Sequence, residues 1–490
     1  MAQHTGCTAT NASKKSTRKR NPPGPRPRTG ARRPPQAGRP KVRPTGAPVA
    51  PRRERTQRRS AQRKVRRAYE RLREGVLRLV TRRETAALAR RTGYSQRTPQ
   101  QLPPFEFALC CALASLVEGK RGFASVWRLL GAVAGRDVAR SAVTQRFGPG
   151  SAKLLEELFL NAVARLPAGG PSELRAKLNV FHEVLAQDGT VLQLSPVLAA
   201  LFPATRTNVV DAAAKVHVCA DVLGRRILGA TVTGERESEL DELYVQGITA
   251  QTLYLVDLGY TSYDLLLDIQ RSSAFVLMRL KANANPTVVR VRQGVRAPRQ
   301  AVGRKIKQLV WCQTQDRFDL DASFPCQLEA KTSVEMRVVG RWDAEAKCYH
   351  RYVTNLPAET WGVEELATLY GQRWIIELLM KLLKSHCHLD HLDTGNPEAL
   401  RTFIYASLLA AVILQSLLVT AAQAAGIPPE QISFLTVGAA APLLVVPLLW
   451  LWLGRTLSPE DMAAMIVRAI AFGCCDQNPG RTRKNHARLS

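Results

Sequence analysis

Apolar residues recur at two spacings along the chain, and the change in spacing predicts where helices give way to strands. Between residues 68 and 165 they stand three and four positions apart, which predicts helices at Phe105–Leu116, Val126–Val133 and Leu154–Leu166. Between residues 180 and 280, short apolar or β-branched runs predict strands with helices between them. These strands are Val180–Gln187, Lys215–Leu223, Ile227–Val232, Thr252–Val256 and Ala274–Leu280, and the helices are Glu235–Gln246 and Ser262–Arg271. The order predicts an α/β fold with a mixed sheet flanked by helices.

Residues 285–351 contain further short strand-like runs and predict a β-rich insertion. The runs are Thr287–Val291, Gln308–Thr314 and Val334–Val339.

The segment Glu364–Ser385 is predicted to form one helix that is apolar on most sides. At about 100° per residue its polar side chains share one narrow stripe, formed by Tyr370, Arg373, Glu377, Lys381 and Lys384. The alternative is an amphipathic surface helix with an intrahelical Glu377–Lys381 pair, which would have a broad polar face. The narrow stripe favours a buried helix whose charges face a site.

Two predicted strands end in an aspartate. Asp188 follows an apolar run and precedes Gly189-Thr190, and Asp257 follows Leu253-Tyr254-Leu255-Val256. A single aspartate in such a place is more often a turn former or a helix cap than a metal ligand. Two of them beside buried strands favour a shared cation, because a charge next to a core persists only when it is paired or bound to metal.

The acidic residues indicate metal-dependent phosphodiester chemistry. Hard carboxylate oxygens suit Mg²⁺ or Mn²⁺, and two ions about 4 Å apart can activate an attacking hydroxyl and stabilise a leaving oxygen. Arg373, Lys381 and Lys384 could hold phosphates while Glu377 binds metal.

The net charge of +30 is concentrated at the N-terminus, where residues 1–67 contain 21 Lys or Arg and one acid, Glu54. Repeated Pro and Gly predict a disordered arm there. It could bind phosphates nonspecifically, or it could be a solvated tail or the product of a wrong start codon. The basic helical region that follows could dock on DNA through Arg136, Arg140 and Arg146, or could be a plain packing domain.

Cysteine usage and the N-terminal sequence predict a reduced, cytoplasmic chain. The ten cysteines include no CxxC pair, and no apolar run near the N-terminus resembles a secretory signal. Residues Thr402–Pro429 and Gln431–Gly454 carry no charge and exceed the roughly 20 residues that span a bilayer. Membrane insertion is therefore an alternative, but helices buried against a catalytic sheet, with no membrane partner, fit the rest of the chain better.

Two further patterns carry less weight. The spacing of His386, Cys387, His388 and His391 matches no closed zinc site. Lys215 and His217 alternate on one strand face, which could approach an active site or DNA, or could face solvent.

Three motifs resemble the insertion sequence four family of DDE transposases, over roughly residues 100–420. Asp188-Gly189-Thr190 is similar to the family's first acidic motif, and Asp257-Leu258-Gly259-Tyr260 to its second, with Arg279 and Lys281 after the next strand. The spacing of Tyr370, Arg373, Glu377 and Lys384 satisfies the Tyr-Arg-Glu-Lys signature. Leu258 departs from the pattern, since the family usually has Arg or Lys there, which puts one phosphate contact in doubt.

The resemblance implies a ribonuclease-H-like core with a β-rich insertion before the last acid, preceded by a helical domain. It implies that Asp188, Asp257 and Glu377 are the catalytic metal ligands, and that Mg²⁺ or Mn²⁺ is the cofactor. The DNA-binding residues would be Tyr370, Arg373, Lys381, Lys384, Arg279 and Lys281. Trp311 is a weak candidate for stacking on a flipped base, and a buried core tryptophan is the alternative.

The family's reaction is nicking at the ends of an element and attack by the freed 3′ hydroxyl on target DNA, often through a hairpin. Its partners are the terminal inverted repeats and target DNA, held by a homodimer. A catalytically inactive DNA-binding protein and a plain Mg²⁺-dependent nuclease are the alternatives. The implied organisation is an arm (1–67), a helical DNA-binding domain (68–170), a catalytic core in two parts (171–284 and 352–396), an insertion (285–351) and a C-terminal helical region (397–490).

Overall fold

The computed structural model separates the chain into two units, residues 1–56 and residues 57–490, and the fold described below is that of the second, except that its first helix begins at Arg52. The structure describes residues 52–95, 102–117, 122–132, 134, 136, 138–166, 177–205, 209–237, 247–260, 262–310, 315–326, 332–392, 394–454, 458, 460, 463 and 467.

Helices make up the first part of the described chain, as the apolar spacing predicts. They are α1 (Arg52–Leu77), α2 (Arg82–Arg91), α3 (Pro104–Ala114), α4 (Phe123–Ala132), α5 (Arg140–Thr144) and α6 (Pro149–Ala164). Helix α1 begins within the predicted disordered arm, so that prediction is wrong for residues 52–67, and residues 1–51 lie outside the described residues. From Arg52 to Glu74 the chain has no Pro or Gly and is rich in Arg, Gln and Glu, which favour helix.

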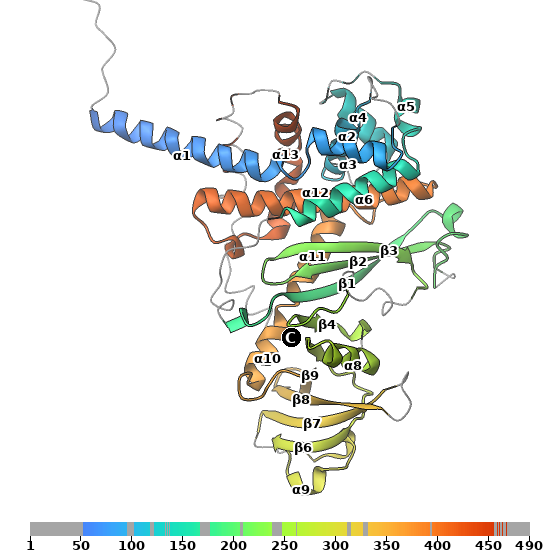
Figure 1. The fold of residues 1–490 in the computed structure, drawn as a ribbon, viewed down its shortest axis with the longest axis vertical. Helices are drawn as coiled ribbons and strands as arrows, with labels where there is room; N and C mark the ends of the chain where they lie inside the picture. The colour runs from blue at the N-terminus through green and yellow to red at the C-terminus, as the bar shows by residue number, and fades with distance from the viewer. Residues whose placement is uncertain are drawn as a thin grey trace, which may run out of the picture. The chain divides into compact units, whose positions relative to one another are not determined.

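One mixed sheet of nine strands forms the centre of the described fold (Figure 1). Its strands are β1 (Val184–Gln193), β2 (Ala213–Asp221), β3 (Arg226–Gly234), β4 (Leu253–Val256), β5 (Phe275–Arg279), β6 (Thr287–Gln293), β7 (Arg317–Pro325), β8 (Ser333–Asp343) and β9 (Cys348–Thr354). The order is β3-β2-β1-β4-β5-β9-β8-β7-β6. Strands β1, β4 and β5 are parallel, and the other neighbours are antiparallel. The predicted mixed sheet flanked by helices is confirmed.

The two faces of the sheet belong to different cores because successive strand residues point to opposite sides. Val184, Ala186 and Leu255 lie in the larger core, which also contains residues of α10 (Val363–Gly371) and α11 (Trp374–Ser385). Leu185 and Tyr254 lie in the second core, together with α8 (Tyr263–Arg271).

Strands β7 and β9 are absent from the predicted set, and the predicted strand Gln308–Thr314 is wrong in its described part. Gln308 ends the 3₁₀ turn η3 (Ile306–Gln308), and residues 311–314 lie outside the described residues. Aspartates are disfavoured in strands, yet β7 carries Asp319 and Asp321 because arginines of neighbouring strands pair with both. Most of the predicted helix Glu235–Gln246 also falls outside the described residues.

The predicted helix Glu364–Ser385 is two helices, α10 and α11, separated at Gln372 and Arg373. Gln372 N–H donates to Leu369 O at 3.0 Å and Arg373 N–H donates to Tyr370 O at 3.0 Å. These bonds to the third preceding residue tighten the chain where Gly371 weakens the helix. The stripe of polar side chains is therefore not continuous, and Tyr370 and Glu377 come from different helices.

Two long helices, α12 (Pro397–Ala425) and α13 (Phe434–Leu453), are apolar enough to cross a membrane by length and composition. The most apolar window of α12 is completely buried, and α12 packs on α6, α3 and β3. Half of the corresponding window of α13 is buried, and that helix contacts α11 and α12. The packing of α12 is that of a core helix, as the sequence favours.

Candidate active site

The strand registers place three predicted site residues side by side. Ala186 pairs with Leu255, and Val256 pairs with Met278. Continuing these parallel ladders puts Asp188, Asp257 and Arg279 in one row across β1, β4 and β5. All three point to the face of the larger core, because they alternate with residues of the second core.

Asp188 lies inside β1, not at its end as predicted, because β1 continues along β2 through Gln193. The parallel pairing of β1 with β4, however, ends at Ala186. The predicted turn after Asp188 is therefore wrong, and Asp188 stands where the sheet opens between β1 and β4.

Helices α10 and α11 bring the third acid to this row. The Tyr370 hydroxyl donates to Val256 O at 3.3 Å and so ties the end of α10 to the residue before Asp257. Tyr370 is buried and its ring packs at a tilt against Tyr352 of β9, with ring centroids 5.2 Å apart. Its contact with DNA stays a prediction, since here it packs and anchors the helix that leads to Glu377.

Arg373 lies among the acids. Its Nη2 donates to Glu377 Oε1 at 2.6 Å and lies 3.7 Å from Asp257 Oδ1. The Arg373 side chain is 15% exposed, whereas Asp257 and Glu377 are 36% and 29% exposed. Its Nε is buried and, among the described residues, has no hydrogen-bond partner. Burial acts to lower the pKa of Arg373, but the surrounding negative charge, including that of all three acids, raises it overall.

The carboxyl of Asp188 has a perturbed pKa. Burial raises its pKa to about 6, and the charges of Asp257 and Glu377 add to the rise. The Gly189 N–H, which donates to Asp188 Oδ1 at 2.8 Å, and the charge of Arg373 act in the opposite direction. A partly buried acid near two others has an excess of negative charge that a cation would relieve.

The donor set suits a hard divalent cation, although the described residues contain no group of three acids, histidines or cysteines already in metal-binding geometry. Carboxylate oxygens are the ligands that Mg²⁺ prefers. In this arrangement the Arg373 guanidinium supplies the positive charge between Glu377 and Asp257. The ligand roles of Asp188, Asp257 and Glu377 stay predictions.

The other predicted DNA-binding residues flank this cluster. Lys381 is exposed on α11 with its Nζ 4.3 Å from the centroid of the Trp374 ring, and Lys384 lies one turn further along. Arg279 is the last residue of β5, and Lys281 is partly exposed in the following turn. The flipped-base candidate Trp311 lies outside the described residues.

Lys215 and His217 lie on the opposite face of β2 from the acids. Val218 is the register partner of Asp188, so the neighbouring His217 points to the other side of the sheet. Both side chains are buried, and His217 Nε2 lies 3.0 Å from Thr233 Oγ1. They therefore neither approach the acids nor face solvent.

Two arginines singled out for DNA docking have packing roles. Arg136 Nη2 donates at 3.0 Å to Glu106, which is 1% exposed and also accepts a bond from Arg82. Arg146 lies over the Tyr94 ring at 5.8 Å, while Arg140 is exposed. These contacts favour the packing alternative for Arg136 and Arg146.

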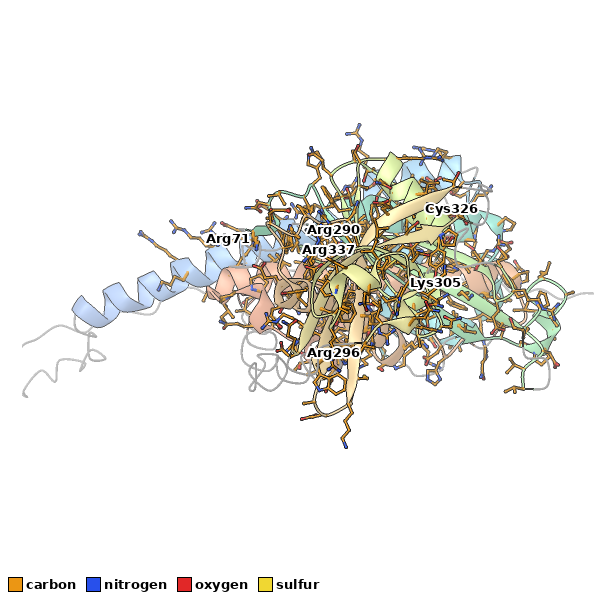
Figure 2. All side chains as sticks on the ribbon, turned by 90° about the horizontal axis from the view of Figure 1, so that it is seen from below. Arg71, Arg290, Arg296, Lys305, Cys326 and Arg337 are labelled. Carbon is orange, nitrogen blue, oxygen red and sulfur yellow. The ribbon has the colours of Figure 1, made fainter. Side chains whose placement is uncertain are left out.

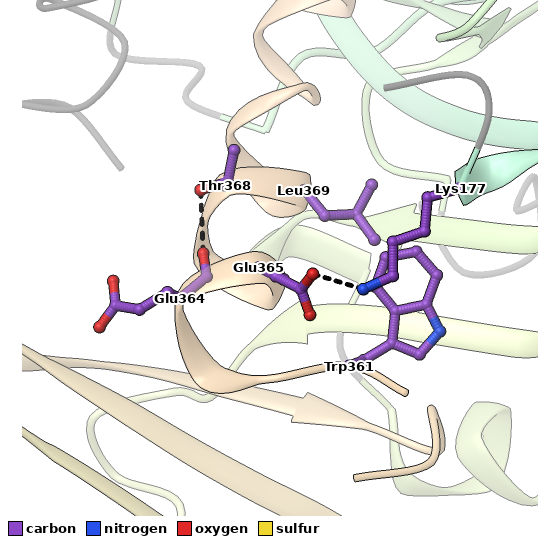
Figure 3. Close-up of a pocket in the computed structure, with 6 residues that line it drawn as sticks. All are labelled: Lys177, Trp361, Glu364, Glu365, Thr368 and Leu369. Atoms are coloured by element: carbon purple, nitrogen blue, oxygen red, sulfur yellow. Dashed lines mark hydrogen bonds and ion pairs between the residues drawn. The ribbon is translucent and has the colours of Figure 1, made fainter. Parts of the chain in front are cut away.

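A small cavity of about 180 Å³ lies beside the start of α10, away from the acids (Figure 3). Lys177 forms an ion pair with Glu365 there, and its Nζ lies 4.7 Å from the centroid of the Trp361 ring. None of the predicted site residues lines this cavity. The Lys177–Glu365 ion pair beside this cavity connects α10 to the segment before β1.

Sequence reasoning missed His350, whose Nδ1 lies 2.7 Å from Arg279 Nη2. It also missed the buried pair formed by Arg337 of β8 and Asp319 of β7; the Arg337 side chain is labelled in Figure 2. His350 is on β9, which the pattern of apolar residues does not predict. No local signal links it to a residue 71 positions away.

Comparison with known proteins places this site within a known domain. Residues 181–413 match the family model described as the transposase DDE domain, and this range contains all three acids. The chain is 39% identical over 82 residues to the transposase for insertion sequence element IS421 of Escherichia coli, which is 17% of this chain and 22% of that protein. It is 37% identical over 65 residues to the transposase for insertion sequence element IS231C of Bacillus thuringiensis subsp. berliner, which is 13% of this chain and 14% of that protein.

The matched segment spans about a fifth of the length of the first of these relatives. A solved structure of the piggyBac transposase synaptic complex with hairpin DNA aligns over 83% of this chain and 85% of that one, at 12% identity and a TM-score of 0.41, a likeness too low to carry weight here. The resemblance to insertion-sequence DDE transposases that the motifs predict is confirmed.

Proposed function

We propose that this chain, a relative of the insertion-sequence DDE transposases, is a DNA transposase that cleaves at the ends of an element and joins the freed 3′ hydroxyl to target DNA. Asp188, Asp257 and Glu377 would be its catalytic acids. The main support is the arrangement around Arg373, where one partly buried guanidinium faces carboxylates from β1, from the end of β4 and from α11.

The three acids are also the residues that would hold Mg²⁺ or Mn²⁺. A bound divalent ion would supply charge to activate a hydroxyl and to stabilise the leaving oxygen of a phosphodiester. A bound cation would lower the raised pKa of Asp188 and so favour its ionised, ligating form. Arg373, Lys381, Lys384, Arg279 and Lys281 would then hold the phosphates of the DNA end, because they surround the acids with hydrogen-bond donors.

The topology supports a ribonuclease-H-like core as the family implies. Strands β1, β4 and β5 are parallel, and β2 and β3 run antiparallel beside β1. Residues 287–354 then add four antiparallel strands before α11 supplies the last acid, as a β-rich insertion would. The partners in this proposal are terminal inverted repeats and target DNA, with two ends held by a homodimer.

The test is an assay with purified protein, Mg²⁺, a target plasmid and labelled DNA carrying the inverted repeats that flank the coding region. We expect strand transfer by the wild type. Binding without cleavage would support the inactive DNA-binding alternative, and nicking without joining would support a nuclease; either result would overturn the proposal.

Glu377→Ala should reduce cleavage by about 1000-fold or more, since losing a metal ligand removes several kcal/mol of transition-state stabilisation. End binding should remain. A matched control is Glu364→Ala, which changes an acid of α10 that pairs with Arg341 outside the cluster. Cleavage retained by the Glu377 variant would contradict its role.

A further inference from the structure

Arg279 is held by a second layer of residues on the same face of the sheet. Arg279 pairs with Tyr352 across β5 and β9, and His350 stands two residues before Tyr352, so both point to the face that carries the acids. Arg279 Nη2 lies 2.7 Å from His350 Nδ1, and His350 Nε2 lies 3.0 Å from Asp343 Oδ2. Hydrogen bonds therefore link Asp343 at the β8–β9 turn, through His350, to Arg279 in the row that contains the acids.

The direction of these hydrogen bonds follows from the chemistry of the groups. A guanidinium can only donate, so Nδ1 of His350 accepts and carries no proton. The imidazole proton is therefore on Nε2 and donates to the Asp343 carboxylate. His350 is a neutral ring with a defined tautomer between a cation and an anion.

Asp343 is itself fixed by the turn that joins β8 to β9. Its Oδ1 accepts the N–H groups of Glu345 and Ala346, both at 2.9 Å. The side chains of His350 and Asp343 are only 17% and 21% exposed. The neighbouring charge on β8 is Arg341, the register partner of His350, and Glu364 of α10 pairs with it.

We propose that His350 is a positioning residue that orients Arg279 for a phosphate of the DNA end. Among the described residues His350 is the only hydrogen-bond partner of the Arg279 side chain, so most of its N–H donors stay free for a ligand. A free arginine loses side-chain entropy when it is fixed. Holding it beforehand lowers that cost on binding. The inference rests on the proposed function.

Two amide substitutions separate the two hydrogen bonds of the ring. His350→Asn places a carbonyl oxygen near the position of Nδ1, so it keeps the acceptor for Arg279 and loses the donor to Asp343. His350→Gln places its amide near the position of Nε2, so it keeps the donor and loses the acceptor. His350→Ala loses both. If the role is only to stabilise the β8–β9 turn, the Gln variant should be the better substitute.

The experiment measures the affinity of the full chain for a labelled duplex carrying the flanking inverted repeat. We expect His350→Ala and His350→Gln to weaken binding about tenfold, as loss of a supporting partner commonly does, and His350→Asn to restore most of it. In the Arg279→Ala background the His350→Ala change should add little, because the two residues act through one contact. Thermal unfolding of each variant checks that the fold is kept.

Restoration by Gln and not Asn, or a full additional loss in the Arg279→Ala background, would overturn the positioning role while leaving the proposed function intact. Failure of the wild type to bind the duplex would overturn both.

Discussion

Two arginines, the buried Arg337 and the partly buried Arg373, meet carboxylates on the same face of the sheet, and they differ in how completely they are paired. Arg337 donates to both oxygens of Asp319, at 2.9 and 2.6 Å, and also to the backbone oxygen of Trp361 at 2.8 Å. Among the described residues, the Arg373 side chain makes one hydrogen bond, to Glu377, and its Nε has no partner; two further acids act on its charge. In the first pair, Arg337 and Asp319, one positive and one negative charge balance each other, and we call it the closed pair. In the second group, Arg373 with Asp188, Asp257 and Glu377, three acids face one arginine, and we call it the open cluster.

The difference separates a structural ion pair from a candidate site. Arg337 ties the segment before α10 to β8 through the backbone oxygens of Leu356 and Trp361. The Arg373 cluster leaves an unpaired donor and an acid with a raised pKa, which is the condition that binding of a cation and a phosphate would relieve.

The largest effect is expected at the closed pair. Asp319→Ala should lower the free energy of unfolding by about 3–5 kcal/mol, because it leaves the Arg337 charge buried and unpaired. Urea unfolding measures the loss. The double variant Asp319→Leu with Arg337→Met should recover most of it, since apolar replacement of a buried pair is often neutral. A cost below about 1 kcal/mol for the single change would show that the pair is not closed.

Mg²⁺ should act on the open cluster alone. At 100 times its dissociation constant it should stabilise the wild type by about 2.7 kcal/mol, because a ligand that binds only the folded state shifts the equilibrium. Thermal unfolding with and without Mg²⁺ measures this. Asp257→Asn should abolish the response and Asp316→Asn, at a 65% exposed acid outside the cluster, should keep it. An equal response in both variants would contradict a metal site at the acids.

The next effect concerns Asp188 and depends on pH. Because its folded-state pKa is raised to about 6, its contribution to stability is complete below the unfolded value and is lost as the pH rises through about 6. Asp188→Asn should therefore stabilise the metal-free protein at pH 8, by about 1–2 kcal/mol after allowing for its partial exposure. At pH 4 the difference should nearly vanish. Unfolding of the wild type and the variant in EDTA at the two pH values measures this difference in the free energy of unfolding. An equal stabilisation at pH 4 and pH 8 would show that the ionised Asp188 carboxylate does not destabilise the fold.

The smallest effect tests the anchor beside the open cluster. Tyr370→Phe removes the hydroxyl that donates to Val256 O and should cost about 1 kcal/mol of stability. Tyr94→Phe is the matched control, because the buried Tyr94 hydroxyl has no partner among the described residues. Its removal should be neutral or stabilising. Similar costs for the two variants would show that the Val256 bond contributes nothing specific.

Strands β1 to β5 of the core could be predicted, because each of them has an apolar or alternating pattern within its own segment. Alternation and apolar runs predict β1 to β5 to within a few residues, apart from the ends of β1. The apolar pattern did not predict strands β7 and β9, because their polar residues are stabilised by partners on other strands. Asp321 of β7 accepts a bond from Arg290 of β6, whose side chain is labelled in Figure 2. No property of residues 317–325 alone reveals that partner.

The sequence by itself determined which residues could form the site, since acids after apolar strands and the spacing of Tyr370, Arg373 and Glu377 are local features. Only the tertiary structure decided how they meet. It interrupts the predicted helix after Gly371, turns Arg373 toward Asp257, and aligns Asp188 with Asp257 through a parallel register between distant segments. It also closes Arg337 on Asp319 and brings His350 to Arg279. These relations depend on strand register and burial, which are set by the whole core and not by neighbouring residues in the chain.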